Sequence, residues 1–483
     1  MVTTMRLPDH KTKIVATIGP ASESPEMLER LIRAGMNVAR LNFSHGDFAG
    51  HAERMARIRA AARATGRRVA IMADLPGPKM RIGQISPDPV ELRPGDPFTL
   101  TTEDVAGSAQ RVSVTFDRLP QVVQPGDRLF LNDGLIQLTV DRVAGREVYC
   151  AVTAGGELRS RKGLNLPGID LGMSAFTPHD RACLEFALEH GVDAVSQSFV
   201  ETAADIEAVR AAAAGTPVFV IAKIERSGAL RHFGDILQAA DGVMIARGDL
   251  GVEVPIEGIA MTQKELIAQA NLAGKPVITA TQMLESMVSS RLPTRAEATD
   301  VANAILDGTD CVMLSAESAM GQYPEAAVGM LARIAAATEA RRTAASLEDV
   351  QRRSRAQRPT TVAEAIAAIV EHALDTVPCA AVFVPTHSGA TARMIARFKP
   401  AVWTVALSAS PAVCQALQFS YGVEPVALTS EPDDWCHFAR GWLQAHEVPG
   451  PIAVLVAGPS ERHPEANYRI EFLPLGQRGP AGS

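Results

Sequence analysis

The sequence has few aromatic residues, no paired cysteines and no long apolar run. Aromatic residues make up 5% of the 483 residues, the formal net charge is -7, and basic residues form no stripe with interleaved aromatics. This composition argues against nucleic acid as a partner. The absence of a C-x-x-C pair fits a reducing compartment and gives no support to a structural zinc site. The cysteines lie at positions 150, 183, 311, 379, 414 and 436.

The N-terminus lacks the apolar core of a signal peptide, and no apolar run reaches the length of a membrane span. We therefore expect a cytoplasmic protein with no membrane partner. A chain of 483 residues with ordinary apolar content is long enough to fold as two or three domains.

Short apolar runs alternate with helical patterns from residue 12 onward. Hydroxyl residues precede proline at Ser24-Pro25 and Thr177-Pro178, which marks two helix starts. The candidate strands are 13–18, 36–42, 69–74, 192–197, 217–223, 242–246, 276–281 and 310–315. Helical patterns lie near 25–34, 47–64, 178–190, 202–213, 227–240, 257–273, 295–307 and 324–340. This alternation predicts an α/β fold, a closed parallel (β/α)8 TIM barrel, with a doubly wound open sheet as the alternative.

Residues 82–172 break this rhythm. Turn sequences such as Pro94-Gly95-Asp96 and Asn132-Asp133-Gly134 separate runs of alternating apolar residues, which is typical of a small all-β domain. The segment follows the third predicted strand, so we expect it to be inserted at the carboxyl end of that strand as a hinged lid over the catalytic face. We call residues 82–172 the lid.

The chain becomes polar and arginine-rich from residue 340 to about 360, as in a linker. Alternating helical and apolar segments follow and predict a separate α/β domain with a mostly parallel sheet. The predicted domains are therefore a barrel (1–81 and 173–343), the lid (82–172) and a C-terminal α/β domain (344–483).

Two apolar runs in 219–253 each end in a charged cluster, Lys223-Ile224-Glu225 and Arg247-Gly248-Asp249. A charge after a buried parallel strand is costly unless the strand has ended or the charge is paired. We therefore place Glu225 and Asp249 at the carboxyl ends of two nearby strands. Two carboxylates there can hold a hard divalent cation such as magnesium. The alternative is a pair of surface salt bridges.

Together these segments resemble the pyruvate kinase family. The resemblance covers nearly the whole barrel and is weaker in the lid and in the last fifty or so residues. It implies transfer of a phosphoryl group from phosphoenolpyruvate to ADP, giving pyruvate and ATP in glycolysis, and a homotetrameric enzyme. The motifs that carry it are TKIVATIGPAS, MNVARLNFSHG, DLPGPKMRIG, KGLNLPG, AKIER, ARGDLGVE, ATQMLESM, PTRAEATDVANAILDGTDCVMLSAESAMGQYP and VPTHSGATAR.

The resemblance assigns the metal and phosphoryl positions. Glu225 and Asp249 match the family's protein ligands for Mg2+ (or Mn2+). Lys223 lies two residues before Glu225 and would offset charge on the phosphoryl group and the enolate oxygen. The alternative is that Lys223 only forms a structural ion pair with Glu225 or a neighbour. Arg40 and Arg81 match active-site arginines, and arginine can grip phosphate oxygens with two N–H groups.

Other matched positions concern the enolate and the nucleotide. Thr281 resembles the threonine near the enolate face that receives a proton, for which we expect a water relay. The amides of Gly248 and Asp249 could bind the substrate carboxylate. His45 and Lys162 match positions near the nucleotide phosphates, and Arg161 adds charge there.

The sequence departs from the family at its monovalent-cation site. Asn42, Ser44 and Asp74 are present, with Leu75 at the fourth position, but Lys79 replaces a common glutamate. A fixed ammonium can supply the same single positive charge. We therefore hypothesise that potassium is not required, the alternative being that Lys79 points to solvent.

A loop in the C-terminal domain resembles the family's effector-phosphate loop. It lies between a predicted strand and a helix, and its candidate ligand residues are Thr386, Ser388, Gly389 and Thr391. The later effector segment reads AGPSERHPEANYR and departs from the family pattern. A sugar phosphate, AMP or no effector all remain open, as does a helix cap without a ligand.

Two rival functions remain on sequence grounds. A metal-dependent aldolase barrel can share the acidic pair and an arginine, but it does not explain the lid or KGLNLPG. A non-catalytic binding protein is the second rival, although the matched catalytic positions retain usable chemistry.

Overall fold

The computed structural model describes residues 6–342, 361–428, 430–458 and 467–476. Eight parallel strands close into a barrel in the order β1-β16-β15-β14-β13-β12-β3-β2. The TIM barrel prediction is therefore confirmed and the open sheet is wrong. The strands are β1 (Lys13–Thr17), β2 (Met36–Asn42), β3 (Ala70–Leu75), β12 (Ala194–Gln197), β13 (Phe219–Ile224), β14 (Gly242–Ala246), β15 (Val277–Ala280) and β16 (Cys311–Leu314).

Helices cover the outside of the barrel, and their starts carry the expected caps. Ser24 accepts a hydrogen bond from the amide of Met27, and Thr177 forms a reciprocal capping box with Asp180. The predicted helix 227–240 is interrupted at His232. The helices are α1 (Pro25–Ala34), α2 (Phe48–Thr65), α4 (Pro178–Glu189), α5 (Ala203–Ala212), α6 (Ser227–Arg231), α7 (Phe233–Ala239), α9 (Ile259–Leu272), α10 (Arg295–Asp307) and α12 (Pro324–Glu339).

Short helices also follow several strands at the carboxyl end of the barrel. Apart from the one at Ile256–Gly258, which overlaps the start of the predicted helix 257–273, sequence patterns did not predict them, since each is only one or two turns long. They are α8 (Arg247–Glu253), η1 (Ile256–Gly258), η2 (Glu285–Val288) and α11 (Ala316–Ala319).

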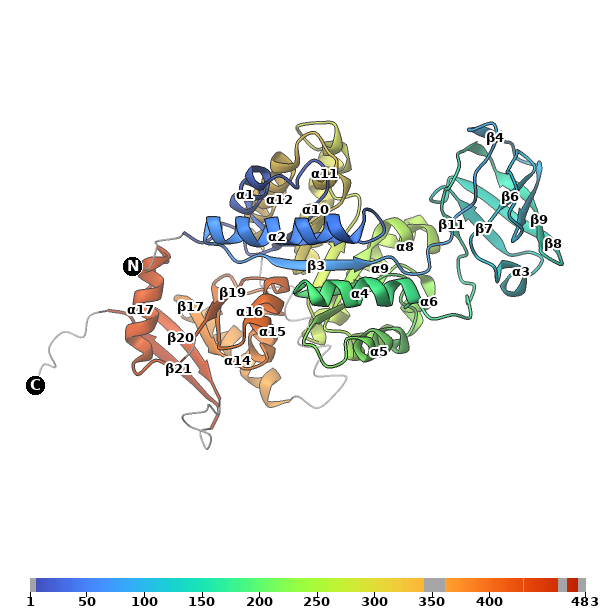
Figure 1. Cartoon of the computed structure of the whole chain (residues 1–483). Helices are drawn as coiled ribbons and strands as arrows, with labels where there is room; N and C mark the ends of the chain where they lie inside the picture. Colours follow the sequence, from blue (N-terminus) through green and yellow to red (C-terminus); the bar gives the residue numbers. More distant parts are fainter. Residues whose placement is uncertain (1–5, 343–360, 429, 459–466, 477–483) are drawn as a thin grey trace, which may run out of the picture.

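The lid leaves the barrel after β3 and lies at the carboxyl end of that strand (Figure 1). Its own core includes Phe98, Leu129 and Leu138, which are fully buried. A six-stranded sheet, β11-β7-β8-β9-β5-β6, and a two-stranded sheet, β10-β4, form it. The elements are β4 (Val90–Leu92), β5 (Pro97–Thr101), β6 (Arg111–Ser113), α3 (Leu119–Val122), β7 (Arg128–Leu131), β8 (Ile136–Ala144), β9 (Glu147–Ala154), β10 (Gly156–Leu158) and β11 (Leu164–Asn165).

The C-terminal part folds as a separate α/β unit with the sheet order β19-β18-β17-β20-β21, in which β21 alone is antiparallel. Residues 343–360, which make up most of the predicted linker, lie outside the described residues, and the domain boundaries stay predictions. The elements are α14 (Val362–Thr376), β17 (Cys379–Pro385), α15 (Ala390–Ala396), β18 (Trp403–Ser408), α16 (Pro411–Ala416), η3 (Leu417–Phe419), β19 (Val423–Ala427), α17 (Trp435–Ala445), β20 (Ile452–Ala457) and β21 (Arg469–Pro474). Within the described ranges, no helix combines the length and apolar character needed to cross a membrane.

The C-terminal unit packs against the amino-terminal end of the barrel strands, opposite the lid. Asp310, which immediately precedes β16, is 3% exposed and accepts hydrogen bonds from the amides of Tyr421 at 2.9 Å and Val277 at 3.1 Å. Lys399 lies 2.7 Å from the same carboxylate and is also buried. Lys13, the first residue of β1, donates to the carbonyl of Val423 at 2.7 Å. Buried polar contacts therefore join the two units.

We expect Asp310→Ala to lower the free energy of unfolding by about 3–5 kcal/mol, because Lys399 would be left as a buried charge without its partner. Denaturant unfolding followed by circular dichroism measures this change. The double variant Asp310→Asn with Lys399→Met is the control, and it should cost less because it removes both charges. A single variant as stable as the wild type would contradict this account of the contact.

Candidate active site

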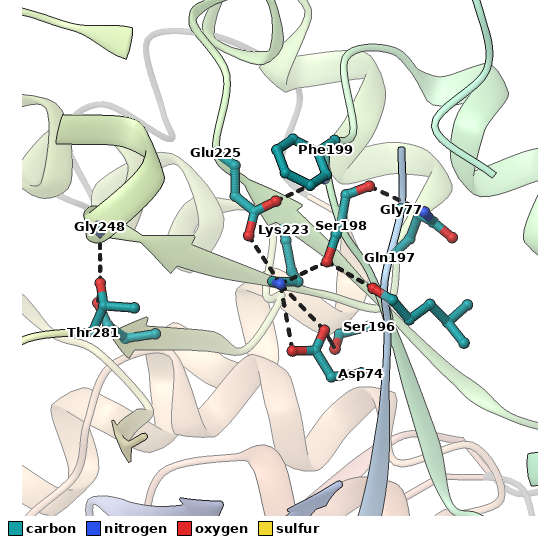
Figure 2. A network of polar contacts seen from close by, with 12 residues as sticks. Asp74, Gly77, Ser196, Gln197, Ser198, Phe199, Lys223, Glu225, Gly248 and Thr281 are labelled. Carbon is teal, nitrogen blue, oxygen red and sulfur yellow. Dashed lines mark hydrogen bonds and ion pairs between the residues drawn. The ribbon is translucent and has the colours of Figure 1, made fainter. Parts of the chain in front are cut away.

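The buried ammonium of Lys223 is the centre of the polar network at the carboxyl end of the barrel (Figure 2). Lys223 Nζ donates to Ser198 Oγ at 2.6 Å and lies 2.9 Å from Glu225 Oε1 and 3.3 Å from Asp74 Oδ1. Burial alone would lower the pKa of Lys223, but Asp74 and Glu225 raise it above the ordinary value. The lysine is therefore held charged at the end of β13.

Asp74 on β3 joins two cations. Arg40 Nε donates to Asp74 Oδ2 at 2.8 Å, while Arg40 Nη1 donates to Thr17 Oγ1 at 2.8 Å. Ser196 donates to the other carboxylate oxygen at 2.7 Å. Burial would raise the pKa of Asp74, but Lys223, Arg40 and the hydrogen bonds lower it to about 2. Asp74 is thus a permanent anion that orients both cations.

Sequence reasoning missed Ser198 and Phe199, which follow β12. Ser198 accepts from Lys223 and donates to the carbonyl of Leu75 at 2.7 Å. Phe199 has a positive φ of 59° and donates its amide to Glu225 Oε2 at 2.8 Å. A side chain at Gly77 would collide with Phe199, since its Cβ would lie 2.8 Å from the ring. The polar run Ser196-Gln197-Ser198 at the end of a strand was the signal available in the sequence.

Glu225 and Asp249 lie at the ends of neighbouring parallel strands, Asp249 in the first turn of α8. Burial, followed by the charge of Glu225, raises the pKa of Asp249 to about 6. A divalent cation between the carboxylates would relieve this repulsion, and oxygen donors suit magnesium. In the part of the chain that the structure describes, no group of three or more acidic, histidine or cysteine side chains could hold a metal ion. The remaining ligands would come from substrate or water.

Thr281 and Gly248 contact each other at the ends of β15 and β14 (Figure 2). The Gly248 amide donates to Thr281 Oγ1 at 2.7 Å, and that hydroxyl donates to the carbonyl of Ala280 at 2.6 Å. Thr281 has a positive φ of 68°, and Arg247 donates to its carbonyl at 2.8 Å. The Gly248 amide, expected to face a substrate carboxylate, therefore already has an acceptor in this structure.

Cationic side chains gather where the barrel meets the lid. Partial burial lowers the pKa of His45, and Lys79, Arg81 and Arg40 lower it further. Arg81 is the last barrel residue before the lid, and it donates to the carbonyl of Arg161 in the lid at 2.9 Å.

Lys162 is also at this junction, where its carbonyl accepts from the amide of Ile82 at 2.9 Å. The side chain of Arg161 is exposed. His45 is thus close to Lys79, Arg81 and Arg40, while Arg161 and Lys162 are joined to the barrel side of this junction through their backbone carbonyls.

The positions predicted for a monovalent cation also come together. Asn42 Oδ1 accepts from the amide of Ser44 at 3.1 Å, and the Leu75 carbonyl accepts from Ser198. With Asp74 bonded to Arg40, each of these oxygens already has a donor.

Lys79 belongs to the same electrostatic environment, although the residue is exposed to solvent. Burial and the charge of Lys223 lower the pKa of Lys79, while Asp74, Asp249 and Glu225 oppose this shift. Lys79 makes no ion pair within 4.0 Å among the described residues.

Hydrogen bonds between its own residues hold the predicted effector loop together. Thr386 Oγ1 accepts from the amide of Gly389 at 2.9 Å, and Ser388 Oγ accepts from Ala390 at 3.4 Å. Thr391 lies in the first turn of α15. Most of the later segment AGPSERHPEANYR lies outside the described residues.

Comparisons with known proteins agree with this geometry. The family models "Pyruvate kinase, barrel domain" and "Pyruvate kinase, alpha/beta domain" match residues 9–328 and 364–467. The chain belongs to the pyruvate kinase family. Pyruvate kinase from Thermococcus litoralis is 50% identical over 88% of this chain and 90% of its own length. The Geobacillus stearothermophilus pyruvate kinase is 45% identical over 86% and 71%.

A solved pyruvate kinase structure shares the fold. The enzyme from Cryptosporidium parvum superimposes with a TM-score of 0.90 and 35% identity, covering 96% of this chain and 97% of its own. The chain is therefore a phosphotransferase of the pyruvate kinase type. The family's substrates and products are phosphoenolpyruvate, ADP, pyruvate and ATP, and the family implies a divalent metal. The aldolase and non-catalytic alternatives are thereby set aside.

We expect Lys223→Met to reduce kcat by roughly 10²–10³, the usual loss when one preorganised charge at a reaction centre is removed. A coupled assay of pyruvate formation measures the effect. Lys264→Met, on the exposed side of α9, is the matched control and should keep wild-type turnover. A folded Lys223→Met enzyme with near-normal kcat would show that the ammonium only balances charge in the fold.

Proposed function

We propose that this pyruvate kinase transfers the phosphoryl group at the site centred on Lys223, with Glu225 and Asp249 holding Mg2+ (or Mn2+). The observation that carries this proposal is the convergence of these three side chains on neighbouring strand ends. When bound, the ion would neutralise charge on the phosphoryl and enolate oxygens.

Lys223 and Arg40 supply fixed positive charge beside the metal site. Both are oriented before substrate binds, because Asp74 and Ser198 hold their donors in place. Groups that are already oriented need little reorganisation as charge develops on the oxygens of the transferred group. Arg81 adds a cation at the edge that faces the lid.

Thr281 is proposed to act near the enolate face, through water. Its hydroxyl bonds the Gly248 amide, so the two form one unit at the substrate's end of the site. A substrate carboxylate would then accept a hydrogen bond from the Asp249 amide. It would share the Gly248 amide with the Thr281 hydroxyl or take its place as acceptor.

The nucleotide is proposed to bind between barrel and lid. Lys79, Arg81 and Arg40 act on His45 at this junction, and Arg161 and Lys162 follow in the lid segment that Arg81 contacts, so positive charge suits the phosphates of ADP there. Closure of the lid would exclude water, which competes with ADP as a phosphoryl acceptor.

Lys79 is proposed to supply the charge of a monovalent cation. Its ammonium interacts with the acidic groups of the site, and the oxygens of Asn42, Asp74 and Leu75 already accept from protein donors. An added potassium ion at these oxygens would be repelled by the positive charge of Lys79. These contacts support turnover that needs only the divalent ion.

The remaining assignments follow from the family alone. We propose a cytoplasmic glycolytic enzyme that forms a homotetramer. The loop with Thr386, Ser388, Gly389 and Thr391 is a candidate for a sugar phosphate or AMP as effector.

In an assay free of sodium and potassium, we expect the wild type to convert phosphoenolpyruvate and ADP to pyruvate and ATP with no gain on adding potassium. Lys79→Glu should lose roughly 10²–10³ in kcat, since it replaces a fixed cation by an anion. Potassium should restore part of this loss, because the carboxylate provides a ligand for the ion.

Lys79→Met is the matched control, because it removes the cation without adding a ligand and should be rescued less. Manyfold activation of the wild type by potassium would contradict the proposed role of Lys79. Absence of ATP formation by the wild type would contradict the proposed reaction itself.

A further inference from the structure

The segment that returns from the lid to the barrel is held by a buried arginine. Arg226 is 2% exposed, and its Nη2 donates to the carbonyl of Ile169 at 2.7 Å and that of Leu166 at 3.3 Å. Its Nε lies 2.7 Å from Glu201 Oε1. One guanidinium therefore bridges the lid's return segment, residues 164–170, and the loop after β12.

A second contact comes from α8. Glu253 accepts a hydrogen bond from the amide of Gly168 and from Ser227, which follows Arg226. Carbonyls and an amide of the return segment are thus bonded by opposite charges on two adjacent barrel elements. Charge-assisted hydrogen bonds of this kind are the stronger ones in proteins.

These contacts lie beside the metal residues. Arg226 directly follows Glu225, and Glu253 lies four residues after Asp249, on the same face of α8. The lid also approaches α8 elsewhere, since a Cβ at Gly134 would lie 3.5 Å from Val252 Cγ1. The lid is therefore attached at the two elements that carry the carboxylates.

We propose that Arg226 and Glu253 form a clasp that positions the lid over the nucleotide side of the site. This inference rests on the proposed binding of ADP between barrel and lid. Arg226 is a positioning residue, since its donors reach the lid backbone and not the reacting groups. Glu225 keeps its own bonds to Lys223 and Phe199, so loss of the clasp leaves the metal side in place.

The test uses Arg226→Met and Glu253→Gln in the full-length enzyme, with Arg231→Met at an exposed position of α6 as the control. We expect faster amide hydrogen exchange at 164–170 in both clasp variants without substrate. We also expect the KM for ADP to rise roughly tenfold while the KM for phosphoenolpyruvate changes little, the scale of one lost charge-assisted hydrogen bond. The control should match the wild type in both measurements.

The proposed clasp would be overturned if amide exchange at 164–170 stayed at the wild-type rate in the two variants. Equal rises in the KM for ADP and the KM for phosphoenolpyruvate would also overturn it. If Arg226→Met does not fold, Glu253→Gln decides, because it keeps the size of the side chain and removes only its charge. The exchange measurement needs no turnover, so it distinguishes failure of the clasp from failure of the proposed reaction.

Discussion

The buried ammonium of Lys223 contacts Asp74, Glu225 and Ser198. The arrangement of charges at the carboxyl end of the barrel depends on these three contacts. Neither the ammonium nor either carboxylate could be buried there alone, since an isolated buried charge is costly. Asp74 in turn orients Arg40, and Phe199 orients Glu225. The result is a set of charges whose positions are fixed before any ligand arrives, which is what phosphoryl transfer requires from a protein.

Two further units are attached to the closed barrel, one at each end of its strands. The C-terminal unit is joined to the amino-terminal end of the strands through Asp310 and Lys13. The lid lies at the carboxyl end (Figure 1). It contacts the barrel through its two chain crossings, through Arg226 and through α8. The contacts of the C-terminal unit and those of the lid are therefore found at opposite ends of the barrel, and the lid shares its end with the candidate site, as is usual for this architecture.

Local sequence patterns were sufficient for most of the fold. The eight barrel strands are apolar runs that end in polar residues, so their number and order could be read from periodicity and turn residues. The short helices after the strands and the antiparallel strand β21 were missed, because such elements depend on tertiary contacts that periodicity does not report. The 11-residue helix α17 was also missed. The break at His232 was missed for the same reason, since the sequence there remains helical in pattern.

The candidate site was predictable only in part. Glu225 and Asp249 stand out because charges follow buried runs, and family resemblance added the others. The bonds from Ser198 to Lys223 and from Phe199 to Glu225 were not predictable, since they join different strands and Phe199 needs a left-handed backbone. Asp74 was assigned to a monovalent-cation site, and its bond to Arg40 and its closeness to Lys223 were not foreseen. Its long-range partners could not be read from spacing.

The most direct test of the central claim is to locate the metal itself. Crystals grown with Mn2+ and phosphoenolpyruvate would show the ion by anomalous scattering. The account predicts one strong peak that contacts both Glu225 and Asp249, with Lys223 Nζ facing the same ligand. A peak held by other residues, or one that contacts neither carboxylate, would contradict it.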